Sequence, residues 1–383
     1  MPQFRFNTIS RAEIERSQGG NTMIQAIDYD GSDHQLVTGV PGSGKTTVTI
    51  MRAERLINQG KNILVLTFQN LLCMSLKNIA QSEGLRNSIF GLYDWYPYRF
   101  GWLDDSHSAE YMIERMNDIN PFDEILIDEG QDFEARIYQA FLPKCRRMTV
   151  GADNAQKVHE SGILALAIKQ ELERNNTTIQ VRLEYNYRNT FEIYNFARYF
   201  MPDSERANNP ITLRLMPRGN GNKPVVIQVL NDEEKFNRIS VILEDAGDRN
   251  IAVLLYHQSE VNLYHRKLQE LGFGCTKYHN RAKPDGNFEN ILITTYKSAK
   301  GLEFQVVVMP DMHTAMNEHR KTREHYYIGC SRAKESLYLT FTGNSLPDFF
   351  KEFSKDSYEF RPAENEPQVL PAERNITEED LPF

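Results

Sequence analysis

The sequence predicts an α/β protein of two domains, each a mostly parallel β-sheet covered by helices. Short runs rich in Val, Ile and Leu recur along the chain, from QLVTG at 35–39 to LYLTF at 337–341. These runs lack the apolar–polar alternation of a strand with one exposed face, so we expect strands buried on both faces. Segments of helical length lie between them, at 45–58, 69–83, 190–200 and 258–271. This alternation is typical of parallel sheets with covering helices.

The strand-like runs form two groups, one before and one after residue 180. Two groups favour two α/β domains over a single very wide sheet. We therefore expect an N-terminal domain at 1–180 and a C-terminal domain at 181–352. The remaining residues, 353–383, are rich in Pro, Glu and Asn and are predicted to form an acidic, disordered tail.

Composition is that of a globular protein, with 40% apolar and 25% charged residues. No apolar run approaches the roughly 20 residues of a membrane span, and the polar N-terminus lacks a secretory signal, so we expect a cytoplasmic protein and no membrane partner. The cysteines stand singly, which predicts reduced thiols without a metal site. The net charge is −8, of which residues 361–383 contribute −4. A basic groove for nucleic acid therefore remains possible.

A phosphate-binding loop is predicted at 39–47, where GVPGSGKTT follows a strand-like run and opens a helical segment. Its glycines let backbone N–H groups surround an anion, and the helix N-terminus adds positive potential. Lys45 would reach the β- and γ-phosphates, and Thr46 would bind Mg²⁺. The predicted nucleotide contacts are Gly39, Pro41, Gly42, Ser43, Gly44, Lys45, Thr46 and Thr47.

Two carboxylates, Asp128 and Glu129, follow the buried run ILI at 125–127. Open α/β sheets bind ligands at this end of their strands. Asp128 would hold Mg²⁺ through water, and Glu129 would orient or deprotonate the attacking water. Acidic residues after a strand more often belong to a solvated loop. Here the phosphate-binding loop at 39–47 favours a catalytic role for Asp128 and Glu129.

Further segments resemble, in order, the motifs of superfamily 1 DNA helicases of the UvrD/Rep/PcrA type. They are LTFQN at 66–70, LEYNYRNT at 183–190, TYKSAKGLEF at 295–304 and YIGCSRAK at 327–334. The resemblance spans residues 35–340 and implies two RecA-like P-loop NTPase domains with ATP in the cleft between them. It also implies ATP and Mg²⁺ as cofactors and single-stranded DNA as partner.

The resemblance assigns roles to residues in these motifs. Tyr187 would pack on the base, Glu303 would bind the ribose, and Arg188 would reach the γ-phosphate. Arg332 would be an arginine finger from the second domain, and Gln156 in GADNAQ would sense the γ-phosphate. One guanidinium group can bind two phosphate oxygens at once. Two such arginines would therefore make closure of the cleft depend on the γ-phosphate.

The DNA contacts are less defined. By the resemblance Phe68 and Asn70 face single-stranded DNA, although a Phe after a strand is as often part of the core. The chain departs from the family by Lys297 in place of a His, and by His159 and Ser161 in place of base-stacking aromatics. The aromatic stretch at 90–100 could grip bases instead, or it could pack in the core.

Gln25 is the candidate for the adenine-selecting Gln of the family, although its flanking residues do not align with the family pattern. The preference for ATP therefore rests on the resemblance. The intervals from Trp95 to Asp128 and from Arg188 to Thr294 are too short for the two inserted subdomains of larger members. We expect a minimal motor that translocates more readily than it unwinds.

The chain ends in EEDLPF, which resembles the terminal peptide of bacterial single-stranded DNA-binding proteins. Such a peptide docks its apolar tip and carboxylate in a partner's pocket. Asp380, Leu381, Pro382 and Phe383 are therefore expected to recruit a protein partner, such as a nuclease. The alternative is a solvated acidic tail.

These observations predict an ATP-dependent single-stranded DNA translocase or helicase that moves 3′ to 5′. One alternative is a DNA-stimulated ATPase switch that loads or regulates a partner nuclease without processive unwinding. Another alternative is a binding scaffold that has lost its ATPase activity. The presence of all the motif residues argues against it.

Overall fold

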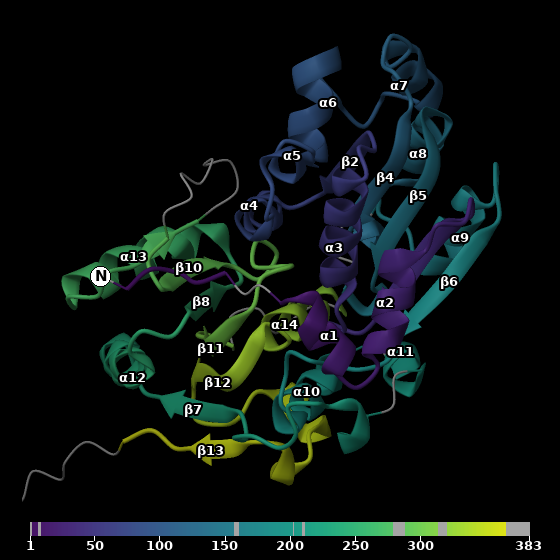
Figure 1. Cartoon of the computed structure of the whole chain (residues 1–383). Coiled ribbons are helices and arrows are strands. Elements are labelled where there is room, and N and C mark those ends of the chain that lie inside the picture. The colour runs from purple at the N-terminus through teal and green to yellow at the C-terminus, as the bar shows by residue number, and fades with distance from the viewer. Residues whose placement is uncertain are drawn as a thin grey trace, which may run out of the picture.

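The computed structural model describes residues 2–6, 9–156, 161–201, 203–208, 211–278, 288–312 and 320–364. Within these ranges the named strands form two sheets, and their pairings are parallel. Helices cover both sheets, so the predicted α/β fold of two RecA-like domains is confirmed. Figure 1 shows the first sheet in blue to teal at the top and right, and the second in green to yellow below.

The first sheet has the order β3-β2-β4-β5-β1-β6. Its strands are β1 (His34–Gly39), β2 (Ile63–Thr67), β3 (Ile89–Gly91), β4 (Phe122–Asp128), β5 (Cys145–Ala152) and β6 (Thr178–Leu183). Its helices are α1 (Arg11–Arg16), α2 (Gly20–Asp28), α3 (Lys45–Asn58), α4 (Asn70–Ile79), α5 (Glu83–Arg86), α6 (Leu92–Phe100), α7 (Ala109–Arg115), α8 (Ala135–Phe141) and α9 (Ala165–Leu172). The phosphate-binding loop and the Asp128 segment follow β1 and β4, which places both at the carboxyl edge of this sheet.

Neighbouring residues of one strand are buried on opposite faces of the first sheet. Val65 and Leu126 pack with α3, α4 and α5, whereas Leu64 and Ile125 pack with α6, α7, α8 and α9. Both faces are therefore covered by helices, which is why the strand sequences show no apolar–polar alternation.

The second sheet has the order β13-β7-β12-β11-β8-β10-β9. Its strands are β7 (Val225–Val229), β8 (Ile251–Leu255), β9 (Thr276–Lys277), β10 (Ile291–Thr295), β11 (Phe304–Met309), β12 (Ala333–Thr342) and β13 (Glu359–Arg361). Its helices are α10 (Phe191–Ala197), α11 (Asp203–Asn208), α12 (Asp232–Ala246), α13 (Gln258–Glu270) and α14 (Arg320–Cys330).

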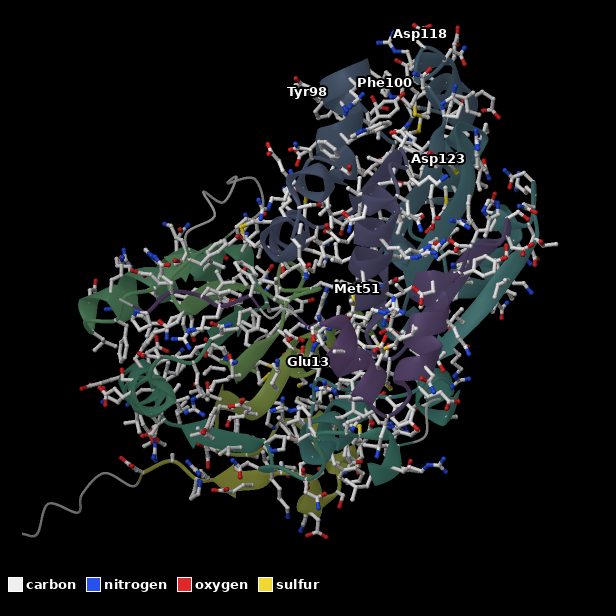
Figure 2. The ribbon with its side chains drawn as sticks, in the orientation of Figure 1. Glu13, Met51, Tyr98, Phe100, Asp118 and Asp123 are labelled. Carbon is white, nitrogen blue, oxygen red and sulfur yellow. The ribbon has the colours of Figure 1, made fainter. Side chains whose placement is uncertain are left out.

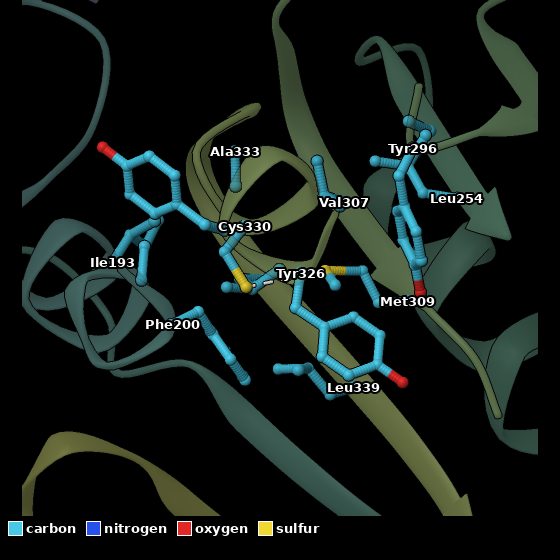
Figure 3. Packing of buried hydrophobic residues seen from close by; sticks show 14 of the residues in the cluster. Ile193, Phe200, Leu254, Tyr296, Val307, Met309, Tyr326, Cys330, Ala333 and Leu339 are labelled. Carbon is cyan, nitrogen blue, oxygen red and sulfur yellow. Dashed lines mark hydrogen bonds between the residues drawn. The ribbon is translucent and has the colours of Figure 1, made fainter. Parts of the chain in front are cut away.

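Two cores lie on the two faces of the second sheet. On one face, residues of α12 and α13 pack against Val253 and Val308. On the other, residues of α10 and α14 pack against Leu254, Val307 and Leu339, as Figure 3 shows. The free thiol of Cys330 lies here, 3.6 Å from the sulfur of Met309.

Local signals set the limits of several elements. α12 begins after Asn231, whose side chain accepts from the Glu234 N–H, and three acidic residues occupy its first turn. This arrangement compensates the unpaired N–H groups and the positive end of the helix dipole. The expected helix at 69–83 instead ends at Ile79, and α5 follows it.

The sequence did not predict β3, β6, β9 or β13. Polar residues interrupt β6, which pairs with β1 at the sheet edge, and its strand character comes from that pairing. The division expected at 180/181 falls inside β6, so we propose a division after Leu183. At the N-terminus, residues 2–6 lie against the second domain, where the Phe4 N–H donates to the Phe288 carbonyl over 2.8 Å.

The expectation of a disordered tail from 353 is wrong for residues 353–361. Phe353 and Tyr358 are buried in the core of the second domain, and β13 pairs with β7. Burial of these two aromatic rings stabilises the segment although the residues around them are mostly polar. The terminal residues Asp380 to Phe383 lie outside the described residues. Within the described ranges, no helix has both the length and the apolar character that crossing a bilayer requires.

Candidate nucleotide site between the domains

The phosphate-binding loop runs from the end of β1 into α3. Gly42 and Gly44 have φ of 76° and 97°, a region that favours glycine. A Cβ on Gly42 would lie 2.5 Å from the Cβ of Arg188. Only glycine at this position lets the chain around Arg188 approach the loop so closely.

The loop offers donors suited to an anion. The Lys45 ammonium donates to the Gly39 and Val40 carbonyls over 2.7 and 3.0 Å. Among the described residues the buried Ser43 hydroxyl has no hydrogen-bond partner. Because a buried polar group without a partner is costly, a phosphate oxygen at this position would compensate it.

The Thr46 hydroxyl donates to the Asp128 carboxylate over 2.8 Å, which brings the two predicted Mg²⁺ ligands together. Burial and the neighbouring Glu129 raise the pKa of Asp128. A divalent cation, which prefers such oxygen ligands, would compensate this buried charge. The donor set therefore fits Mg²⁺.

Glu129 follows directly, with φ of 57°. Its carboxylate accepts from the Gln131 amide over 2.6 Å and lies 3.4 Å from the Lys300 ammonium. Burial alone would raise the pKa of Glu129, but the cations of Lys300, Lys45 and Arg332 outweigh burial and lower it. The carboxylate is thus held ionised, as a general base requires.

Residues of the second domain reach into the first at this point. The Arg332 guanidinium donates to the Gln156 side-chain oxygen over 3.0 Å. The fully buried Lys300 donates to Asp132 over 2.7 Å and to the Gln156 carbonyl over 2.6 Å. Gln156 therefore accepts hydrogen bonds from two residues of the second domain.

Arg188 lies in the segment that connects the two sheets. Its Nε donates to Glu303 over 3.0 Å, and Lys334 donates to the other oxygen of Glu303 over 2.9 Å. Burial and the nearby Arg188 lower the pKa of Arg332. Two crowded guanidinium groups fit an anionic ligand, which would relieve their repulsion.

A cavity of about 580 Å³ lies between the domains. Figure 2 labels Glu13 and Met51, two residues of its lining, where the domains meet. The predicted site residues that line it are Pro41, Gly42, Gly44, Lys45, Thr46, Thr47, Glu129, Gln156, Tyr187, Arg188, Glu303 and Arg332. Apolar side chains from near the N-terminus, such as Phe6 and Ile14, line its other part.

Not every predicted residue reaches this cavity. Gln25 is exposed on α2 and does not line it. Tyr187 does line it, but its hydroxyl donates to the Gln18 carbonyl and its ring stacks on Tyr185 with centroids 6.2 Å apart. The contact with Gln18 uses its backbone carbonyl, which leaves no signal in the residue type at position 18.

The predicted DNA contacts lie away from this cavity. Phe68 packs edge-on against Phe133 and Tyr93, with centroids 5.9 and 5.5 Å away, which is the core-packing alternative. Asn70 begins α4, and its side chain hydrogen-bonds to Tyr278 of the second domain. A role of either residue in binding DNA stays a prediction.

Sequence reasoning missed Lys300, Asp132, Ser331 and Asn189 as site residues. Asn189 is buried and donates to the Ser331 and Ala333 carbonyls over 3.3 and 2.5 Å, which holds the Arg332 segment beside Arg188. The available signal was the Lys of SAKGLEF, which stands between the small residues Ala299 and Gly301.

Two parallel α/β domains with a phosphate-binding loop at their interface define a P-loop nucleotide-binding protein. Residues 24–160 match the family model described as AAA domain, and residues 290–340 match the model described as UvrD-like helicase C-terminal domain. The resemblance to UvrD-like helicases is thereby shown.

A solved structure, the C-terminal domain of a possible DNA helicase from Lactobacillus plantarum WCFS1, matches at 20% identity. The match covers 45% of this chain and 98% of that chain with a TM-score of 0.36. No curated protein matches the sequence.

Proposed function

We propose that this protein is an ATP-dependent motor on single-stranded DNA that hydrolyses ATP between its two domains. One observation carries the proposal. Arg188 and Arg332 line the same cavity as Lys45 and Thr46 of the phosphate-binding loop, and Arg332 comes from the second domain. A nucleotide in this cavity would touch both domains, so its γ-phosphate could govern their closure.

The residues of the first domain support hydrolysis. Lys45 and the N–H groups of the loop would bind the β- and γ-phosphates, and Thr46 and Asp128 would hold Mg²⁺. When bound, Mg²⁺ would neutralise charge on the phosphate oxygens. Glu129, kept ionised by its cationic neighbours, would orient the attacking water and take its proton.

The second domain would supply the coupling. Arg332 now donates to Gln156, so both are poised to turn toward a γ-phosphate and to lose that contact after hydrolysis. Alternating closure and opening would advance a strand held by both domains, in the 3′ to 5′ direction that the resemblance implies. Phe68 and Asn70 are the proposed DNA contacts of the first domain.

The test is the ATPase rate with and without single-stranded DNA at several salt concentrations. We expect strong stimulation that weakens with salt, because phosphate contacts release counterions. Glu129→Gln should abolish the activity while Glu173→Gln, the same change at the exposed residue that follows α9, should leave it intact. A hydrolysis rate that ignores both DNA and Glu129→Gln contradicts the proposal.

Strand movement needs its own assay. Displacement of streptavidin from a biotinylated strand end reports translocation, and separation of a duplex reports unwinding. Stimulated ATPase without either movement would instead support the DNA-stimulated switch that regulates a partner nuclease.

We propose separately that the tip formed by Asp380, Leu381, Pro382 and Phe383 recruits a protein partner. The support is its sequence alone, an acidic stretch that ends in apolar residues and a carboxylate. Removal of Leu381, Pro382 and Phe383 should release the partners that the whole chain retains in pull-downs. Unchanged retention contradicts this proposal without affecting the motor.

A further inference from the structure

Large aromatic side chains are exposed at the end of the first domain that lies farthest from the cavity. Tyr98 is 90% exposed and Trp102 is 76% exposed, and Tyr111 nearby is 38% exposed. Figure 2 shows Tyr98, Phe100 and Asp118 together at this end, well away from Glu13 and Met51 of the cavity lining. We refer to residues 98–118 as the aromatic tip.

The aromatic tip is anchored on its inner side. Trp95 and Tyr96 of α6 are buried, and Trp95 packs against Phe141 with ring centroids 5.5 Å apart. Arg115 of α7 donates to the Phe100 carbonyl over 2.6 Å, which ties the end of α6 to α7. The exposed rings therefore extend from a segment that is held on the core.

The loop between α6 and α7 is held in the same way. Arg136 of α8 donates to the carbonyls of Asp104 and His107 over 2.7 and 2.5 Å. The His107 ring stacks on Tyr111, with centroids 4.2 Å apart. These contacts hold the backbone that carries the exposed rings, and a backbone that is ordered before binding loses little freedom on binding.

Charge decides which partner suits the aromatic tip. It carries more carboxylates than cations, and the side chain of Asp105 is 95% exposed. The carboxylates are Asp104, Asp105, Glu110, Glu114 and Asp118, against the cations Arg99 and Arg115. Arg99 lies over the Trp95 ring, 5.3 Å from its centroid. Such a surface repels phosphates, and it repels the acidic end of this chain as well.

We propose that the aromatic tip docks a protein partner through a basic segment that carries apolar side chains. Tyr98 and Trp102 would pack against the apolar residues, and the carboxylates would pair with Lys or Arg around them. The proposal is independent of the ATPase, because the aromatic tip contributes no residue to the cavity lining.

The experiment uses Trp102 as its own reporter, because the chain has 2 Trp and the other, Trp95, is buried. In a Trp95→Phe variant of the full chain, acrylamide should quench Trp102 strongly. A peptide of alternating Lys and Leu should protect Trp102, whereas a Glu and Leu peptide and an oligothymidylate should not. If Trp95→Phe does not fold, anisotropy of the labelled Lys and Leu peptide on the unaltered chain replaces the quenching.

Matched variants then locate the binding. Tyr98→Ser with Trp102→Ser, and separately Asp105→Asn with Glu110→Gln and Glu114→Gln, should each weaken peptide binding at least about tenfold. Leu166→Ser, at another apolar side chain that is mostly exposed, on α9, should leave it unchanged. The basal ATPase should be the same in all of them. The proposal is overturned if the aromatic tip variants bind like the unaltered chain, if the oligothymidylate protects Trp102, or if protection grows with protein concentration alone.

Discussion

Lys300 is the most consequential single residue that the motifs left without a role. It is fully buried, it comes from the second domain, and its partners Asp132, Glu129 and Gln156 belong to the first. Burial alone would lower the pKa of Lys300, but Asp132 and Glu129 raise it, so the group stays charged. One cation therefore links the position of the second domain to the charge of the proposed general base.

Lys300→Met should lower both the stability of the protein and its ATPase rate. Removing the cation leaves buried carboxylates without its charge, which costs about 3–5 kcal/mol of unfolding free energy. We expect the DNA-stimulated ATPase to fall about a hundredfold, as for the loss of one stabilising group at a reacting centre. Urea unfolding and steady-state hydrolysis measure the two quantities.

The double variant Lys300→Met with Asp132→Asn provides the control. It should recover stability, because Asp132→Asn removes the carboxylate charge that faced the lost cation, but its ATPase rate should stay as low as that of Lys300→Met. If activity returned with stability, Lys300 would act only by holding the fold together.

His34 predicts a pH dependence of stability. It is buried at the start of β1, where its Nδ1 accepts from the Met148 N–H over 2.9 Å and its Nε2 lies 2.8 Å from the Asn175 oxygen. Burial lowers the pKa of His34. The unfolded chain therefore binds this proton first, so the stabilisation is complete above the ordinary pKa of about 6.5 and is lost as the pH falls below it.

His34→Asn keeps an acceptor for the Met148 N–H but does not titrate. The unaltered chain should lose stability relative to this variant between about pH 7.5 and 5.5, by roughly 1.4 kcal/mol for each unit of pKa difference. Urea unfolding at the two pH values measures it. Parallel changes in the two proteins would show that His34 is not the responsible group.

At the scale of elements, the segment that follows β12 shows how aromatic residues override a polar composition. Phe353 contacts the rings of Phe196, Phe200 and Phe350, with centroids 5.1, 5.0 and 5.0 Å away. β13 then extends the sheet beyond β7. This segment closes the core under α10, so it is part of the second domain and not of a tail.

Phe353→Ala should destabilise the protein by about 3–4 kcal/mol, the cost of emptying a large buried ring site. Phe360→Ala, in β13 of the same segment, should cost under about 1 kcal/mol because that ring is 42% exposed. Thermal or urea unfolding of the pair compares them directly. Equal losses would mean that the segment contributes through β13 and not through the core.

At the scale of the whole molecule, the two domains meet around the cavity that holds Lys45 and Arg332, and the N-terminal segment also joins them. Residues 2–6 pack on the second domain, with Phe4 edge-on to Phe304 at 5.6 Å, and α1 then packs on α2 in the first. Residues of the phosphate-binding loop line one side of the cavity. Arg188 and Arg332 line another side, and apolar residues near the N-terminus line the rest. A ligand that fills this cavity would contact both domains.

Nucleotide binding should therefore stabilise the whole molecule. With Glu129→Gln, which should prevent hydrolysis, ATP and Mg²⁺ at about one hundred times the Kd should add about 2.7 kcal/mol to the free energy of unfolding. Adding Arg332→Ala should reduce this gain at the same ATP concentration, because the second domain then loses its proposed contact with the γ-phosphate. ADP should stabilise both variants alike. If ATP stabilised the protein equally with and without Arg332→Ala, Arg332 would not contact the γ-phosphate.

The sequence by itself determined the α/β class, the strands buried on both faces, the phosphate-binding loop and the order of the helicase-like motifs. These features are written in short local patterns: continuous apolar runs, glycines beside a Lys-Thr pair, and carboxylates after a strand. Only the tertiary structure decided that Lys300 is buried among carboxylates of the other domain, that Gln25 faces solvent, that Phe353 joins a core and that Trp102 does not. Burial and contact depend on which distant segments fold together, and no local pattern carries that information.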